Sequence, residues 1–327
     1  MRAANPSLAD KVACLRSLCG PGDEAIETHF AWVFLVGDHA WKLRKPVRRD
    51  PMDYGTLEAR RADSLEEVRL NRRLAPGVYE RAAPLTVDFD GRLSIDGEGE
   101  VVDWLVCMRR LDRTRQLDAV LQADPHAAID SVAHLLAGFY RRAAPAITDG
   151  DAYLRRLRRK LEDNRRALTG MAIPHASELA AAQSVFLQGP GAGPLAERAA
   201  TGCVVECHGD LRPEHVYVDD PPLVIDCLEF DVDLRILDRA EELCFLELEC
   251  RRAGHAAAGR RLREQCLAEL GDPATPALLD FYRSHRAATR AKLYAWRAGE
   301  PDGGDPAHWR DRAAQYVAAA LTDLRPH

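Results

Sequence analysis

The periodicity of the chain changes near residue 109, and this change constrains the fold more than any other feature of the sequence. Up to that point the pattern is strand-like, with one strong helix, TLEARRADSLEEVRLNRRL, at 56–74. Beyond it the pattern is mostly helical, interrupted by one compact β-rich segment at 203–230. We therefore expect an α+β fold with a small β-rich first lobe, residues 1–108, and a larger, mostly helical second lobe, residues 109–327.

Apolar runs and turn residues place the individual elements. In the first lobe, two runs flank Gly37-Asp38 and predict a hairpin, and further strands follow the helix. These strands are expected at 28–36, 40–43, 85–89, 92–95 and 101–108. The helices of the second lobe are expected at 127–143, 151–168, 177–188, 240–269, 276–298 and 308–323.

Composition narrows the class of protein. The chain has 327 residues, 46% of them hydrophobic and 29% charged, and a formal net charge of −6, which excludes intrinsic disorder and argues against a nucleic-acid partner. The longest early apolar run, Phe30–Val36, is far shorter than the roughly 20 residues of a membrane span, and no secretory signal precedes it. The nine cysteines are accordingly expected to be reduced thiols in a cytoplasmic protein without a membrane partner.

The β-rich segment reads CVVECHGDLRPEHVYVDDPPLVIDCLEF and contains a predicted hairpin with an acid at each end. Asp210 precedes the first strand, His215 begins it, and Asp226 follows the second strand. Because a hairpin brings its ends together, we expect these three side chains to converge. Phosphoryl transfer uses such a set: one carboxylate orients and deprotonates the attacking hydroxyl, and another holds Mg²⁺ on the phosphates. The spacing follows the kinase catalytic loop and its metal-binding Asp.

A kinase site also needs a strand lysine for the phosphates and a helix glutamate to hold that lysine. Lys42 lies on the second strand of the first-lobe hairpin. Lys45, which directly precedes a proline, is the alternative for the phosphate-binding lysine. Glu67 lies on the following helix, with Glu66 as the alternative. Glu67 also fits a capping box with Ser64, although the helical pattern begins earlier, near residue 56.

Several segments together resemble a known family. WVFLVGDHAWKLRKPV, EVRLNRRLAP, MRRL and CHGDLRPEHV…VIDCLEF are similar to segments of the aminoglycoside phosphotransferases, and more closely to those of an uncharacterised bacterial branch. The resemblance runs from about Glu27 to Cys250, and the HGDL and IDC motifs are its most specific part. It implies a bilobal protein-kinase-like fold.

The resemblance also implies roles for single residues. Asp210 would be the catalytic base and Asp226 a metal ligand, while Lys42 would bind phosphate with the support of Glu67. The nucleotide would further contact Thr28, at the start of the first expected strand, and the hinge residues Val106 and Met108. His208 and Asp238 would support the catalytic loop, and Glu242 stands where the family has a second downstream Asp.

His215 departs from the family, which usually has Asn at this position. An imidazole can bind a divalent cation, but Mg²⁺ prefers oxygen ligands, so His215 favours either Mn²⁺, a single metal, or weakened catalysis. A nucleotide-binding pseudokinase is therefore the alternative to an active enzyme. A metal-dependent hydrolase that uses His208, Asp210 and Asp226 is a third interpretation.

The expected function is that of a small-molecule kinase. With Mg²⁺ or Mn²⁺, it would transfer the γ-phosphate of ATP or GTP to an alcohol group of an acceptor such as an aminosugar or amino alcohol. The acids after the metal motif would form a substrate rim that suits a cation, or they are simply solvated turn residues. These acids are Glu229, Asp231 and Asp233.

Overall fold

The structure is a computed structural model that describes residues 6–49, 52–127, 129–300 and 304–324. The chain divides into two compact units, one formed by residues 1–119 and 215–234 and the other by residues 120–214 and 235–327. This division differs from the expected boundary after residue 108. The reason is that Tyr217 and Leu223 of the late hairpin share a hydrophobic core with Val106 of the first sheet.

The first unit contains a six-stranded antiparallel sheet in the order β1-β2-β3-β8-β6-β7. The strands are β1 (Glu24–Glu27), β2 (Ala31–Val36), β3 (His39–Arg44), β6 (Tyr79–Val87), β7 (Leu93–Ile95) and β8 (Glu100–Arg109). Two short pairs complete the unit, namely β4 (Arg48–Arg49) with β5 (Met52–Asp53), and β11 (Val216–Tyr217) with β12 (Leu223–Val224).

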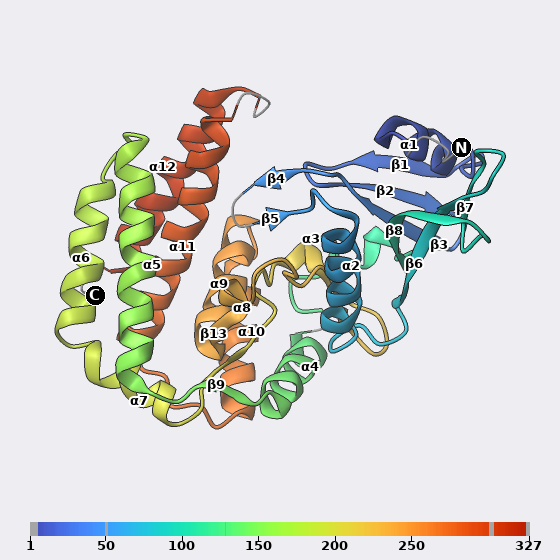
Figure 1. The fold of residues 1–327 in the computed structure, drawn as a ribbon. Helices are drawn as coiled ribbons and strands as arrows, with labels where there is room; N and C mark the ends of the chain where they lie inside the picture. The colour runs from blue at the N-terminus through green and yellow to red at the C-terminus, as the bar shows by residue number, and fades with distance from the viewer. Residues whose placement is uncertain (1–5, 50–51, 128, 301–303, 325–327) are drawn as a thin grey trace. The chain divides into compact units, whose positions relative to one another are not determined.

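Two helices cover the two faces of this sheet (Figure 1). Helix α1 (Leu8–Arg16) packs its Leu15 against Phe34 and Leu43 on one face. Helix α2 (Leu57–Asn71) packs Val68 against the other face. Thr56 caps α2 by accepting the N–H of Ala59 at 3.1 Å, so the helix begins at its predicted start.

The second unit is mainly helical, and α5, α6, α11 and α12 pack together in it (Figure 1). Its helices are α4 (Ile129–Arg142), α5 (Gly150–Gly170), α6 (Ala176–Gln188), α7 (Ala192–Ala200), α9 (Arg239–Arg252), α10 (Ala256–Glu269), α11 (Pro276–Ala298) and α12 (Pro306–Asp323). A three-stranded sheet joins β9 (Pro145–Ile147), β10 (Val204–Glu206) and β13 (Ile236–Asp238). Two helices, α3 (Leu117–Ala123) and α8 (Val232–Arg235), each contain a position at which the chain leaves one unit and enters the other.

The single helix expected at 240–269 is wrong, because the chain turns between α9 and α10. Gly254 adopts φ +93°, a left-handed conformation that favours glycine, and the N–H of His255 bonds to the carbonyl of Cys250 at 2.8 Å. This closes α9 in the way that glycine commonly ends helices. A single glycine within a helical pattern is tolerated in proteins, so Gly254 does not by itself indicate the end of a helix.

Two further expectations concern the whole chain. All nine cysteines are free, and seven of them are buried, as expected for reduced thiols. Among the described residues, none of the helices combines the length and the apolar character that crossing a bilayer requires.

Candidate functional site

The strand register places the predicted lysine on the same sheet face as an apolar row. Lys42 of β3 lies opposite Val33 of β2 and Val106 of β8. Because side chains alternate between faces, the row two residues along, Leu35, Ala40 and Met108, shares this face. This face of the sheet therefore carries a row of apolar side chains next to the ammonium group of Lys42.

Lys42 makes the ion pair that the kinase pattern predicts. Its Nζ lies 2.7 Å from Oε1 of Glu67 on α2 and 3.6 Å from Oδ1 of Asp226. Glu66 instead bonds to Arg69 at the surface, and Lys45 pairs with Glu27. Of the alternatives left open by the sequence, the structure thus selects Lys42 and Glu67 as partners.

Burial and the neighbouring guanidinium of Arg44 act to lower the pKa of Lys42, but the facing carboxylates of Glu67, Asp226 and Glu229 outweigh them and raise it. The ammonium group is therefore charged at neutral pH. A fixed positive charge of this kind on a sheet face is suited to binding phosphate oxygens.

A second cation on β3, Arg44, lies at the centre of a buried acidic cluster. Its guanidinium pairs with Asp63 at 2.6 Å, with the second oxygen of Glu67 at 2.5 Å, and with Glu229. These four side chains are at most 7% exposed. The three carboxylates lie close enough together to hold a metal ion, but the guanidinium already forms ion pairs with all of them. We therefore interpret the cluster as structural.

Burial, together with the surplus of carboxylates in this cluster, perturbs the ionisation of Glu229 and Asp63. Burial raises the pKa of Glu229 to about 7. The negative charge of Glu67 also raises this pKa, whereas the positive charge of Arg44 lowers it. The same causes raise the pKa of Asp63 to about 6. Folding therefore favours protonation of this cluster above the pH at which exposed carboxyl groups ionise.

This shift predicts a pH-dependent stability. A carboxyl group with a raised pKa keeps its proton in the folded state after the unfolded chain has lost it, so unfolding releases protons between about pH 4.5 and pH 7. The contribution of Glu229 to the free energy of unfolding should fall as pH rises through this range. Urea titrations should show a shallower pH dependence for Glu229→Gln than for the wild type, whereas equal slopes would contradict the assignment.

Asp226 is held in place by backbone contacts within the same unit. It adopts φ +63°, a left-handed conformation that costs free energy for a residue with a side chain. Its N–H donates to the hydroxyl of Tyr79 at 3.2 Å, and the next N–H, of Cys227, donates to Asn71 at 2.9 Å. Nε2 of His215 lies 3.4 Å from Oδ2 of Asp226, so the predicted convergence of these two residues is observed.

The loop that carries Asp210 belongs to the second unit, and a carboxylate of α9 holds it. Glu242 accepts the N–H groups of His208 at 3.0 Å and Gly209 at 2.6 Å, together with the hydroxyl of Tyr140 at 2.8 Å. The ring of His208, which is 1% exposed, accepts the N–H of Asp210 at 3.3 Å. The sequence indicates Glu242 only as a replacement for a family Asp, whereas in the structure Glu242 bonds directly to the loop.

Asp238, the other residue expected to support this loop, has different partners. It pairs with Arg198, accepts the hydroxyl of Tyr282 at 2.8 Å, and caps α9 by accepting the N–H of Ala240 at 2.8 Å. These bonds connect α7, β13, α9 and α11. Asp238 therefore stabilises the second unit, while the bonds to the loop come from Glu242.

The remaining predicted residues are dispersed. Thr28 closes the turn between β1 and β2 by bonding to both backbone groups of Ala31. Val106 is 0% exposed within the core, whereas Met108 is partly exposed. Of the three rim acids, Glu229 is buried against Arg44, and Asp233 is exposed on α8. Asp231 is half-buried and accepts the N–H of Asp233 at 2.8 Å.

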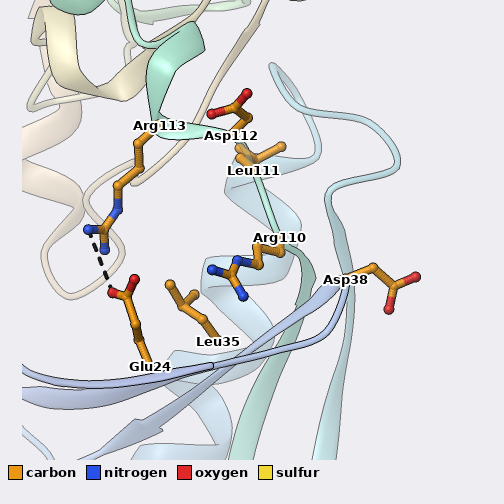
Figure 2. Close-up of a pocket in the computed structure, with 7 residues that line it drawn as sticks. All are labelled: Glu24, Leu35, Asp38, Arg110, Leu111, Asp112 and Arg113. Atoms are coloured by element: carbon orange, nitrogen blue, oxygen red, sulfur yellow. Dashed lines mark ion pairs between the residues drawn. The ribbon is translucent and has the colours of Figure 1, made fainter. Parts of the chain in front are cut away.

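A pocket of about 450 Å³ lies at the end of the apolar row in the first unit (Figure 2). Leu35 of β2 and Leu111, just beyond β8, supply apolar surface, and Glu24 faces Arg113 at 3.9 Å. The other lining residues are Asp38, Arg110 and Asp112. No sequence pattern indicates residues 110–113 as pocket residues, because the expected hinge residues Val106 and Met108 both lie within β8.

Comparison with solved structures identifies the fold. The chain has the protein-kinase-like fold of small-molecule phosphotransferases. It matches the GDP and kanamycin complex of APH(2″)-IIIa with a TM-score of 0.57 and 17% identity, covering 95% of this chain and 96% of that one. A choline/ethanolamine kinase family protein from Mesorhizobium loti matches with a TM-score of 0.54 and 16% identity, covering 97% and 98%. The resemblance found in the sequence motifs is thus confirmed for the fold.

Mycobacterial proteins are among the relatives that match the sequence. Uncharacterised proteins from Mycobacterium tuberculosis and Mycobacterium bovis are 33% identical to the chain over 294 residues. The alignment covers 84% of this chain and 56% of each relative, so the chain spans little more than half of their length. No protein-family model matches the sequence.

Proposed function

We propose that the protein is a small-molecule kinase that transfers the γ-phosphate of ATP or GTP to a hydroxyl group. The observation that carries this proposal is the placement of Lys42 between Glu67 of α2 and Asp226 of the late hairpin. This joins a phosphate-binding cation to a candidate metal ligand in a chain whose fold is that of phosphotransferases.

The nucleotide base is proposed to occupy the pocket beside Leu35 and Leu111, with its phosphates extending along the same sheet face toward Lys42. Apolar side chains at one end and a fixed cation at the other match the two parts of a nucleoside triphosphate. The complex of a structural neighbour with GDP supports testing a guanine nucleotide beside ATP.

The donor atoms at Asp226 fit a divalent cation. Its carboxylate is 49% exposed, so it offers hard oxygen ligands, and His215 adds an imidazole nitrogen 3.4 Å away. Bound Mg²⁺ would neutralise phosphate charge, and the nitrogen ligand makes Mn²⁺ a second candidate. The chain's own contribution is to fix Asp226 through Tyr79 and Asn71, as described above.

Asp210 is proposed to orient the acceptor hydroxyl and to take its proton. Glu242 and His208 hold the loop so that the carboxylate has a defined position before substrate arrives. Such preorganisation is the main contribution a protein makes to phosphoryl transfer.

Nucleotide binding to Lys42→Met is the direct test of the proposal. Losing a charge-assisted contact to phosphate should weaken binding of ATP or GTP, in the presence of Mg²⁺, by about 10- to 100-fold. Titration calorimetry on the wild type and the variant measures this change. Lys45→Met is the matched control, since Lys45 pairs with Glu27 instead, and its affinity should match the wild type.

The outcome also separates the alternatives. Nucleotide binding with turnover supports the kinase, and binding without turnover under any acceptor or metal supports the pseudokinase. Metal-dependent activity that Lys42→Met leaves unchanged would contradict both and favour a hydrolase.

A further inference from the structure

Two arginines of the second unit flank the carboxylate of Asp210. Nε of Arg212 donates to Oδ2 at 3.0 Å, and Nη1 of Arg290, on α11, lies 3.8 Å from Oδ1. Both arginine side chains are largely buried, 22% and 14% exposed. Neither the spacing of the HGDL motif nor the resemblance predicts a cation at position 290.

Arg290 has more hydrogen-bonding capacity than its neighbours use. A guanidinium carries five N–H donors, and among the described residues Arg290 donates one hydrogen bond, to the hydroxyl of Tyr294 at 3.3 Å. Its Nε is buried without a hydrogen-bond partner. Buried donors in native proteins are normally satisfied, so the free capacity indicates an anionic or strongly polar ligand.

A further guanidinium strengthens the positive character of this region. The guanidinium of Arg312, on α12, lies 5.5 Å from the centre of the Tyr294 ring, and that of Arg290 lies 5.3 Å from the same ring. Burial alone would raise the pKa of Tyr294, but the two arginines outweigh burial and lower it. The phenol therefore lies in a field that favours negative charge.

The nearby acids already have partners within the unit. Glu214 pairs with Arg212 at 2.6 Å, and Glu249 accepts the hydroxyl of Tyr316 at 2.7 Å. Burial raises the pKa of Glu249, and the positive charge of Arg290 opposes this rise. These acids leave the remaining donors of Arg290 unused.

From this arrangement we infer that the acceptor is an anion: a hydroxyl compound that carries a carboxylate or phosphate group bound by Arg290 near Asp210. The inference rests on the proposed function. The acceptor oxygen forms a bond to the γ-phosphorus, its proton passes to Asp210, and the bond between the γ-phosphorus and the β–γ bridging oxygen breaks as the nucleoside diphosphate leaves. A cationic aminosugar would instead place its positive charge against the unused donors of Arg290, at an electrostatic cost.

A matched set of six-carbon compounds tests the charge preference. Gluconate supplies a carboxylate, glucose 6-phosphate a phosphate, glucose no charge and glucosamine a positive charge. Binding to the nucleotide-loaded protein is measured by calorimetry, and phosphate transfer is measured by nucleoside diphosphate release. At least one anion should bind about tenfold or more tightly than glucose and glucosamine, and the pair of anions distinguishes a carboxylate site from a phosphate site.

Variants at position 290 identify the residue responsible. Arg290→Gln should weaken anion binding and raise the KM for the anion by about tenfold or more, with little change in the KM for nucleotide. Arg290→Lys keeps the charge and should retain part of the affinity. Arg310→Gln, on the exposed face of α12, is the control and should bind like the wild type. Thermal unfolding of each variant checks that it folds.

Three results would each overturn the inference. The protein would prefer glucosamine to both anions, or neither anion would bind at about 10 mM, or Arg290→Gln would bind the anion as tightly as the wild type. These results differ from failure of the proposed function. If the kinase assignment is wrong, ATP and GTP fail to bind or Lys42→Met has no effect, whereas an error in acceptor class leaves nucleotide binding intact.

Discussion

Asp210→Asn is expected to lower the kcat of phosphate transfer by about 10²- to 10⁴-fold, the range for loss of a general base. Asparagine preserves the shape of the side chain but cannot accept the proton of the acceptor hydroxyl. The loop should keep its conformation, because Glu242 bonds to the backbone of His208 and Gly209 and not to the substituted carboxylate. Steady-state release of nucleoside diphosphate measures the effect.

Nucleotide affinity provides the control for this variant. Asp210 is proposed to act on the acceptor, so the dissociation constant for ATP or GTP should change little in Asp210→Asn, in contrast to Lys42→Met. A variant that retains more than about a tenth of wild-type kcat would show that Asp210 is not the base. A variant that loses nucleotide binding as well would assign Asp210 to the nucleotide site.

Arg44→Met is expected to destabilise the protein by about 3–5 kcal/mol, because it leaves buried carboxylates without their shared cation. Arg44 joins β3 to two acids of α2 and to Glu229, three residues beyond Asp226. Its loss should also free Glu67 from the geometry in which it holds Lys42. Urea unfolding followed by circular dichroism measures the change in the free energy of unfolding.

The matched control replaces an exposed arginine of the same unit. Arg48 pairs with Asp53 at 3.1 Å, but these side chains are 69% and 60% exposed, so Arg48→Met should cost about 1 kcal/mol or less. Adding Glu229→Gln to Arg44→Met should recover part of the lost stability by removing one unpaired charge. A loss below about 1 kcal/mol for Arg44→Met would contradict the proposed structural role of the cluster.

Local patterns identified most of the elements that carry the site. The helix expected at 56–74 is α2, Leu57–Asn71, because its cap and apolar spacing are properties of neighbouring residues. The strand expected at 40–43 is β3, His39–Arg44, for the same reason. Because successive side chains of β3 point to opposite faces of the sheet, the sequence also places Lys42 on the face opposite to that of Leu43. The turn at Gly254 was not identified, because a lone glycine within a helical pattern does not by itself mark the end of a helix.

Sequence alone determined the residue types and spacings of the phosphotransferase motifs, and hence the class of fold, since these are encoded locally. Tertiary structure decided the partners: Glu67 rather than Glu66 for Lys42, Glu242 for the loop before Asp210, and Arg44 for Glu229. Residues far apart in the chain meet only when elements pack, and burial then selects which charges must be paired. For this reason an acid expected on a substrate rim is instead buried against an arginine of β3.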